Sequence, residues 1–185
     1  VGIFTLSYNT TGLRNTATGN YGLVSNDSGG DNAAYGYQAL TNNTRGSQNV
    51  AMGPNTLLYN KGNNGSTAIG YQAMMNPDTS EFFPEQRTTY NTAIGYESLK
   101  GNYPPWNNTG TDNTATGAHT LKNNSAGSSN VAIGSRALFT NTTGNTNIAI
   151  GRSALYSNTD KSNLMAIGDS ALFYNTTGNM NLAFG

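Results

Sequence analysis

The ionisable side chains are the first place to look for chemistry, and this chain has few of them. Its 185 residues include nine acidic side chains, nine basic ones and a single histidine, His119, while cysteine is absent. A lone histidine outside any catalytic motif is expected to be solvated rather than catalytic. No Cys/His cluster, no His-Glu-x-x-His motif and no Gly-Lys-Ser/Thr phosphate loop occurs. The absence of these motifs favours a protein that is not an enzyme and that uses no cofactor or metal.

The carboxylates offer no clearer site. A glycosidase needs two placed carboxylates, and although Glu81 and Glu85 share one segment, nothing in the sequence positions them. A calcium site carried by a repeat needs acidic ligands at the same place in each copy. The acidic residues do not recur in this way; they are Asp27, Asp31, Asp78, Glu81, Glu85, Glu97, Asp112, Asp160 and Asp169. We therefore expect no calcium site built from the repeats.

Recognition by aromatic side chains is the better candidate for a binding function. Two segments, 75–90 and 100–112, hold aromatic residues among stiffening prolines, and these are Phe82, Phe83, Tyr90, Tyr103 and Trp106. Tryptophan and tyrosine are enriched at recognition sites, and elaborated loops on rigid scaffolds commonly bind ligands. They could bind a surface receptor or a glycan. Alternatively, they pack on one another or on a neighbouring chain and only cover the scaffold.

Asparagine-containing triplets form a third class of candidate. Asn-x-Ser/Thr recurs along the chain, for example at Asn9, Asn141 and Asn175, and is an N-glycosylation acceptor in a host with the machinery. The Asn-Thr-Thr-Gly sequence is also typical of a turn. Turn formation is the simpler interpretation of these triplets.

All of these residues lie on a repeat with a period of 17. Glycines recur through the chain, and eight of the ten steps between them are 17 residues; they are Gly2, Gly19, Gly36, Gly53, Gly70, Gly95, Gly117, Gly134, Gly151, Gly168 and Gly185. An alanine stands two places before each glycine after the first, for example Ala68, Ala93, Ala132, Ala149 and Ala166. A leucine or methionine stands four places after every glycine but the last. A fixed period of this size, with one strand signal and one Asn/Thr/Gly turn per copy, is typical of a solenoid.

The repeat predicts an all-β fold, a parallel β-solenoid of ten coils. A 17-residue coil encloses a core only a few side chains wide, so a residue larger than alanine would collide inside it. The glycine fits a corner, where it can adopt positive φ. Stacked coils pair their strands about 4.8 Å apart, which gives a rod roughly 50 Å long. We also expect the turn asparagines to stack as hydrogen-bonded ladders along the rod.

The two longer steps mark insertions in a single domain, residues 1–185. Gly70 to Gly95 spans 25 residues and Gly95 to Gly117 spans 22, which is 17 plus 8 and 17 plus 5. Because both fall in the same turn of consecutive coils, we expect the segments 75–90 and 100–112 to emerge side by side on one face.

The strands also predict self-association. Apolar residues flank the alanines on both sides: Val131 and Ile133, Ile148 and Ile150, Leu164 and Ile167, Leu182 and Phe184. A strand that is apolar on both sides is buried on both. The thin coil can bury only one side, so we expect the other to contact a second copy of the chain.

The repeat resembles the head repeats of YadA-like trimeric autotransporter adhesins, which carry a Val-Ala-Ile-Gly strand followed by a small-residue turn. Residues 130–134 (Asn-Val-Ala-Ile-Gly) and 66–70 (Ser-Thr-Ala-Ile-Gly) match it. Residues 91–99 (Asn-Thr-Ala-Ile-Gly-Tyr-Glu-Ser-Leu) resemble the repeats of phage tail-fibre-like and bacterial surface proteins. The resemblance implies a left-handed β-roll and a side-by-side homotrimer on a cell or virion surface. The adhesin heads use a shorter repeat, near 14, so the turn corner is longer here.

These observations together predict a structural building block of an extracellular fibre or filament. With no net charge and no basic cluster, the chain is a poor nucleic-acid binder, and no apolar run is long enough to insert into a membrane. Both ends fall within the pattern, which predicts either a piece of a longer fibre or coils that stack end to end. A receptor- or glycan-binding module that uses the aromatic segments is the alternative. Ice binding is a weaker one, because the threonine pairs Thr16/Thr18 and Thr114/Thr116 do not continue into neighbouring copies.

Overall fold

A computed structural model describes residues 2–77, 87–103 and 107–185. Three of the aromatic residues proposed for recognition, Phe82, Phe83 and Trp106, lie outside the described residues. So do the central parts of both insertions.

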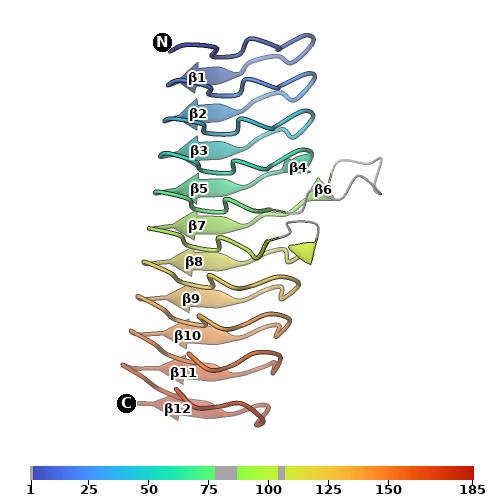
Figure 1. Ribbon diagram of the computed structural model, residues 1–185. Helices are drawn as coiled ribbons and strands as arrows, with labels where there is room; N and C mark the ends of the chain where they lie inside the picture. Colours follow the sequence, from blue (N-terminus) through green and yellow to red (C-terminus); the bar gives the residue numbers. More distant parts are fainter. Residues whose placement is uncertain (1, 78–86, 104–106) are drawn as a thin grey trace.

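The described chain forms a parallel β-solenoid, as the sequence predicts, with one short strand per coil (Figure 1). Ten strands make one sheet in the order of the chain: β1 (Thr16–Thr18), β2 (Ala33–Tyr35), β3 (Val50–Met52), β5 (Thr67–Ile69), β7 (Thr92–Ile94), β8 (Thr114–Thr116), β9 (Val131–Ile133), β10 (Ile148–Ile150), β11 (Met165–Ile167) and β12 (Leu182–Phe184). Two further strands, β4 (Asn63–Asn64) and β6 (Arg87–Thr88), pair with each other at the edge where the first insertion leaves. The described residues contain no α-helix.

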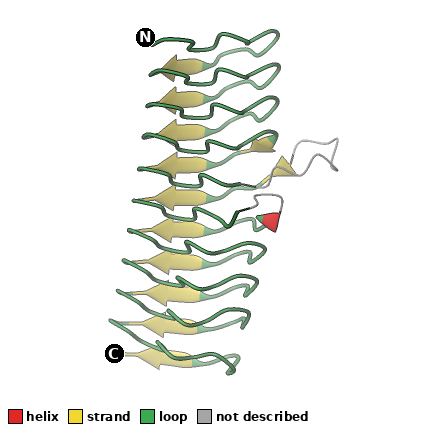
Figure 2. Cartoon of the chain, viewed as in Figure 1, coloured by secondary structure: helices red, strands yellow, loops and turns green. Residues whose placement is uncertain are grey.

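Each strand pairs with the next in identical register. Ala149 lies opposite Ala132 on one side and Ala166 on the other, and the same alignment holds along the whole sheet. In Figure 1 the strands run behind the rest of each coil, and the path winds in a left-handed sense toward the C-terminus. Figure 2 shows the sheet along one side of the rod and irregular backbone completing every coil.

The core is a narrow column of alanine and leucine. The strand alanines from Ala34 to Ala166 are fully buried, and so are leucines such as Leu23, Leu138 and Leu155. The strand alanines therefore lie in the core, as the sequence predicts; that a larger residue would collide there stays a prediction. Met74 takes the leucine position in one coil and is 3% exposed.

The corners depend on left-handed backbone, and not only at glycine. Gly134 has φ 119°, as expected for an anchor glycine at a corner, but Leu138 also has φ 50°. The leucine position has φ between 45° and 54° in every coil from Leu6 to Leu172. A left-handed non-glycine residue costs roughly 1–2 kcal/mol. Complete burial of the side chain and a hydrogen bond from Leu138 N to Ala154 O in the next coil, 3.0 Å, offset that cost.

Candidate functional site: the outer sheet face and the insertion edge

The outer face of the ten-stranded sheet is a regular surface that runs the length of the described rod. In each strand the central alanine points into the core, so the residues on either side of it point outward. The in-register pairing aligns these outward residues into two rows. The first outer row contains Thr16, Ala33, Val50, Thr67, Thr92, Thr114, Val131, Ile148, Met165 and Leu182, and the second outer row contains Thr18, Tyr35, Met52, Ile69, Ile94, Thr116, Ile133, Ile150, Ile167 and Phe184.

The second outer row is apolar and accessible. Met52 is 42% exposed and Ile133 is 41% exposed, although both lie within a continuous sheet. From β2 to β12, Thr116 is the only polar member of this row. The whole face, ten strands about 4.8 Å apart and three residues wide, is on the order of 450 Å², and the threonines Thr67, Thr92 and Thr114 of the first outer row interrupt its apolar character. A contiguous apolar patch of a few hundred Å² is typical of an interaction surface.

The expectation for one residue of the outer face, Leu164, is wrong. Leu164 was expected to flank the alanine of its strand outwardly, but it lies before β11 and is 1% exposed. Met165 occupies the outward position instead. The misreading has a simple cause: Leu164 replaces an asparagine that is buried at this place in most other coils, such as Asn130.

The threonine pairs considered for ice binding lie on the same sheet face. Thr114 and Thr116 occupy the two outer rows in β8, but their neighbours in β9 are Val131 and Ile133. The threonine pair therefore does not continue into the next strand, although single threonines occupy the first outer row in three consecutive strands, at Thr67, Thr92 and Thr114.

A second surface feature is a file of aromatic rings along the coils. Phe139, Tyr156 and Phe173 stack face to face, with centroids 5.1 and 4.8 Å apart and ring planes within 3°. Tyr71 stacks on Tyr96 in the same way at 5.3 Å. Because each ring covers its neighbour's face, mainly ring edges remain for solvent. Such an arrangement stabilises the stacking of coils and offers few free faces to a sugar ring.

The turn asparagines form the hydrogen-bonded ladder that the sequence predicts. Asn43 donates its amide to Oδ1 of Asn26 at 2.7 Å, and Asn60 donates to Oδ1 of Asn43 at 2.7 Å. Asn141 and Asn158 continue the same pattern in later coils. We call this set the turn ladder; its members are Asn9, Asn26, Asn43 and Asn60 before the insertions and Asn124, Asn141 and Asn158 after them.

A second ladder, which the sequence analysis missed, runs beside the first just before the strands. Asn49 donates both its backbone N–H and its side-chain amide to Oδ1 of Asn32, at 3.0 and 3.1 Å. Asn130 makes the same two bonds to Asn113. The recurrence of asparagine one residue before the strand was the available signal. The sequence analysis interprets this asparagine as part of the strand motif, whereas its side chain is a separate buried group.

Asn9 and Asn141, two of the three proposed glycosylation residues, are members of the turn ladder, and the third, Asn175, forms a hydrogen bond within its own turn. Asn141 is fully buried, and its amide nitrogen donates to Asn124 and to Gly144 O, so glycosylation at Asn141 is incompatible with the folded coil. Asn9 accepts from Asn26 and donates to Gly12 O. Asn175 donates to Gly178 O at 2.9 Å. The side chains of these three asparagines therefore stabilise turns. Asn107, in another Asn-x-Thr triplet, is exposed.

The bases of the two insertions lie together, as expected. Asn76, near the start of segment 75–90, donates to Gly101 O, and Asn108, in the second half of segment 100–112, donates to Asn76 O at 2.6 Å. Arg87 donates to Thr109 O across the same edge. Of the described aromatic candidates, Tyr90 is 67% exposed and Tyr103 is 79% exposed.

A cluster of charges lies next to the second insertion. The Glu97 carboxylate receives Lys100 Nζ and Lys122 Nζ, each at 2.7 Å, and His119 Nδ1 lies 3.2 Å from it. Glu97 is nearly buried, and burial by itself raises the pKa of its carboxyl. The hydrogen bonds from Lys100 and Lys122 outweigh that effect and lower the pKa to about 2. Lys122 lies in the coil after Glu97, whereas Lys100 lies in the same coil as Glu97 and also donates to Gln72 Oε1 in the preceding coil, so the cluster joins coils. Within the described chain no group of three or more His, Cys, Asp or Glu side chains could hold a metal ion.

In the part of the chain that the structure describes, no helix is long and apolar enough to cross a membrane. Comparison with known proteins gives no match: no family model matches the chain, and no curated protein or solved structure is significantly similar to it. The resemblance to YadA-like heads and tail-fibre repeats therefore stays a prediction from residues 66–70, 91–99 and 130–134.

Proposed function

We propose that this chain is a non-enzymatic structural unit of an extracellular fibre or filament, in which copies pack side by side through the outer sheet face. The observation that carries the proposal is the second outer row, an apolar file that runs from Tyr35 to Phe184. An exposed apolar patch of a few hundred Å² is often an interaction surface. The inside of the coil is already filled by alanine and leucine, so a second molecule is the remaining way to cover the row.

The regularity of the rod supports a mechanical role. The sheet, in identical register, bonds each coil to its neighbours along the axis, and asparagine ladders and stacked rings add further contacts over parts of the rod. Such nearest-neighbour bonding gives stiffness in one dimension, which suits a shaft or the head of a surface adhesin. Three copies around a common axis would cover all the outer faces at once, in keeping with the trimer implied by the adhesin-like repeats.

The test is the mass in solution by light scattering, with electron microscopy of the same sample. The unmodified chain is expected to form a discrete trimer or a filament. Introducing charge with Ile133→Lys and Ile150→Lys should dissociate it to monomers. The matched control is Ser135→Lys, a substitution at an exposed residue just beyond the strand. A stable monomer of the unmodified chain would contradict the proposal.

A receptor- or glycan-binding role for the insertions is the second candidate. It is favoured by the exposure of Tyr90 and Tyr103 near the joined bases of the two insertions. Replacing both by alanine should remove binding to cells or to a glycan array while leaving assembly unchanged. Tyr174→Ala is the matched control, because Tyr174 is 84% exposed on a coil without an insertion. Binding that survives the double substitution would eliminate this role for the two tyrosines.

A further inference from the structure

The turn ladder is interrupted in the coils that carry the insertions. Its asparagines stand seven residues after a corner glycine, but Pro77 occupies this place in the first of these coils. Asn60, the last member before the break, has a buried Oδ1 without a hydrogen-bond partner among the described residues. In the next coil Asn102 donates to a backbone oxygen instead of a ladder asparagine. Within the described residues, the turn ladder therefore has no amide-to-amide bond between Asn60 and Asn124.

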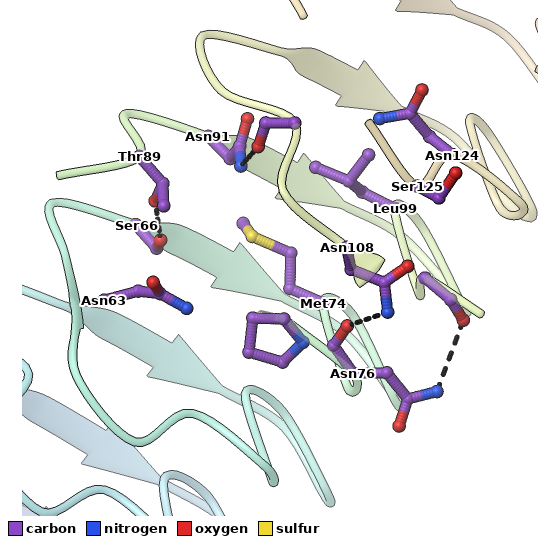
Figure 3. Close-up of a pocket in the computed structure, with 13 residues that line it drawn as sticks. Asn63, Ser66, Met74, Asn76, Thr89, Asn91, Leu99, Asn108, Asn124 and Ser125 are labelled. Carbon is purple, nitrogen blue, oxygen red and sulfur yellow. Dashed lines mark hydrogen bonds between the residues drawn. The ribbon is translucent and has the colours of Figure 1, made fainter. Parts of the chain in front are cut away.

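The second ladder, just before the strands, is interrupted in the same part of the rod. Ser66 takes the place of the asparagine there, so it has no amide to share with the next coil. Its hydroxyl pairs instead with the Thr89 hydroxyl at 2.7 Å, as Figure 3 shows. The ladder resumes where Asn113 donates to Oδ1 of Asn91. Both sets of neutral cross-links between coils are thus reduced at the insertions.

Packing is also incomplete in this part of the rod. A cavity of about 30 Å³ lies there (Figure 3). Met74 and Leu99, which occupy the leucine position in the two coils that carry the insertions, line it. Atoms that line a cavity lack contacts on one side, so the coils are held together less strongly by packing here.

The charged cluster around Glu97 joins the coils across which the turn ladder is missing. Lys100 Nζ donates to Gln72 Oε1 at 2.8 Å, which connects its coil to the preceding one. Lys122 Nζ lies 2.7 Å from the Glu97 carboxylate, which connects the same coil to the following one. These contacts therefore span the coil steps on both sides of Asn102.

We propose that this cluster is a charged brace that replaces the asparagine ladders across the coils that carry the insertions, and that these coils are the part of the rod that acid opens first. The amides of the asparagine ladders do not ionise, so acid leaves their bonds in place. The exposed ion pairs elsewhere, such as Arg14 with Asp31 and Arg152 with Asp169, contribute little. This inference concerns bonding within one chain and does not depend on the proposed function.

Acid weakens the brace in two ways. Burial raises the pKa of the Glu97 carboxyl, but the hydrogen bonds from Lys100 and Lys122 outweigh burial and hold the pKa at about 2. A carboxyl freed by opening titrates near 4.5, so opening becomes easier as the pH falls from about 4.5 toward 2. Protonation also leaves Lys100 and Lys122, and His119 when it is protonated, around a neutral carboxyl. Like charges held together in this way repel one another.

Hydrogen exchange of the full chain at about pH 6 and about pH 3, followed by mass spectrometry of its peptides, tests the proposal. Leu99 N bonds to Thr120 O at 2.9 Å within the braced coils, and Leu155 N makes the corresponding bond to Ala171 O at 3.0 Å outside them. After correction for intrinsic exchange, protection at Leu99 should fall on the order of 30-fold, as the lowered pKa of Glu97 predicts, whereas protection at Leu155 should change little. An equal fall at both places, or no fall at Leu99, would overturn the proposal.

Glu97→Gln separates the brace from other effects of acid. The amide keeps the size of the side chain but carries no charge, so protection at Leu99 should already be reduced at pH 6 and should fall no further at pH 3. Asp31→Asn is the matched control, because it makes the same change in an exposed pair with Arg14 that joins coils of the continuous ladder. It should leave the pH response at Leu99 as in the unmodified chain. A pH response at Leu99 that survives in Glu97→Gln would overturn the brace. The comparison of Leu99 with Leu155 in the unmodified chain decides the matter if that variant does not fold.

Discussion

Asn141 donates its side-chain amide to Oδ1 of Asn124, the asparagine one coil earlier, over 2.8 Å. The same nitrogen donates to Gly144 O within its own turn, and Asn141 Oδ1 accepts from Asn158. One fully buried side chain therefore closes its own turn and joins three coils. This is how a sequence rich in asparagine, threonine and glycine forms a rigid rod rather than a disordered chain.

The first prediction concerns that side chain. Asn141→Ala removes its bonds to two neighbouring coils and leaves buried partners in both, so we expect a loss of about 2–4 kcal/mol in the free energy of unfolding. Chemical denaturation followed by circular dichroism measures it. Asn107→Ala is the matched control, since Asn107 also begins an Asn-x-Thr triplet but is exposed. Equal losses in the two variants would contradict a structural role for the ladder.

The fold could be predicted from the sequence because several independent physical constraints act on each copy of the repeat. Ala132 must be small, Gly134 must adopt positive φ, and Leu138 must fill the core, so each constraint appears as an exact recurrence. The left-handed conformation of Leu138 could not be read in the same way. Leucine carries no preference for that region, and only the hydrogen bonds between coils impose it.

The candidate site was less predictable, for two reasons. The outer sheet face was inferred from apolar residues on both sides of the alanine, and the structure gives them the expected outward positions except at Leu164. One break in the turn ladder was available in the sequence, because the ladder asparagines stand seven residues after a corner glycine and Pro77 stands there after Gly70. In the next coil the sequence keeps Asn102 at this position, and only its hydrogen bond to Asn123 O shows that it does not continue the ladder.

The second prediction concerns the corner glycine. Gly134 has φ 119°, and a Cβ added to it would lie 2.7 Å from the backbone of Gly151 in the next coil. Gly134→Ala therefore combines an unfavourable backbone conformation with a collision against backbone atoms, and we expect a loss of at least about 2 kcal/mol. Gly62→Ala is the control, because a Cβ there meets no atom within 4 Å. Thermal unfolding of both variants gives the comparison, and an unchanged midpoint for Gly134→Ala would refute the argument.

The third prediction tests the width of the coil. Ala132 is fully buried between Ala115 and Ala149, so Ala132→Leu inserts three carbons where the core has no room. Overpacking of this kind costs about 1–3 kcal/mol or more. Ala126→Leu, at an exposed turn residue, adds the same atoms outside the core and should be nearly neutral. The unfolding midpoints distinguish the two, and a tolerated leucine at Ala132 would mean that the coil can widen.

The fourth prediction is a pH dependence at Glu97. Lys100 and Lys122 hold its folded-state pKa near 2 despite burial, whereas a free carboxyl titrates near 4.5. Because the folded pKa is the lower one, the stabilisation is fully present above about pH 4.5 and is lost as the pH falls toward 2. At pH 7, Glu97→Gln should cost on the order of 2–3 kcal/mol.

The measurement is the difference in unfolding free energy between the unmodified chain and Glu97→Gln, from pH 7 down to pH 2. The difference should shrink through the window between about pH 4.5 and pH 2, because protonation makes the wild-type carboxyl neutral like the amide. Asp112→Asn, which makes the corresponding acid-to-amide change at an exposed carboxylate, is the matched control. A gap for Glu97→Gln that stays constant to pH 2 would mean that packing, rather than the two lysine ion pairs, is what this buried carboxylate contributes.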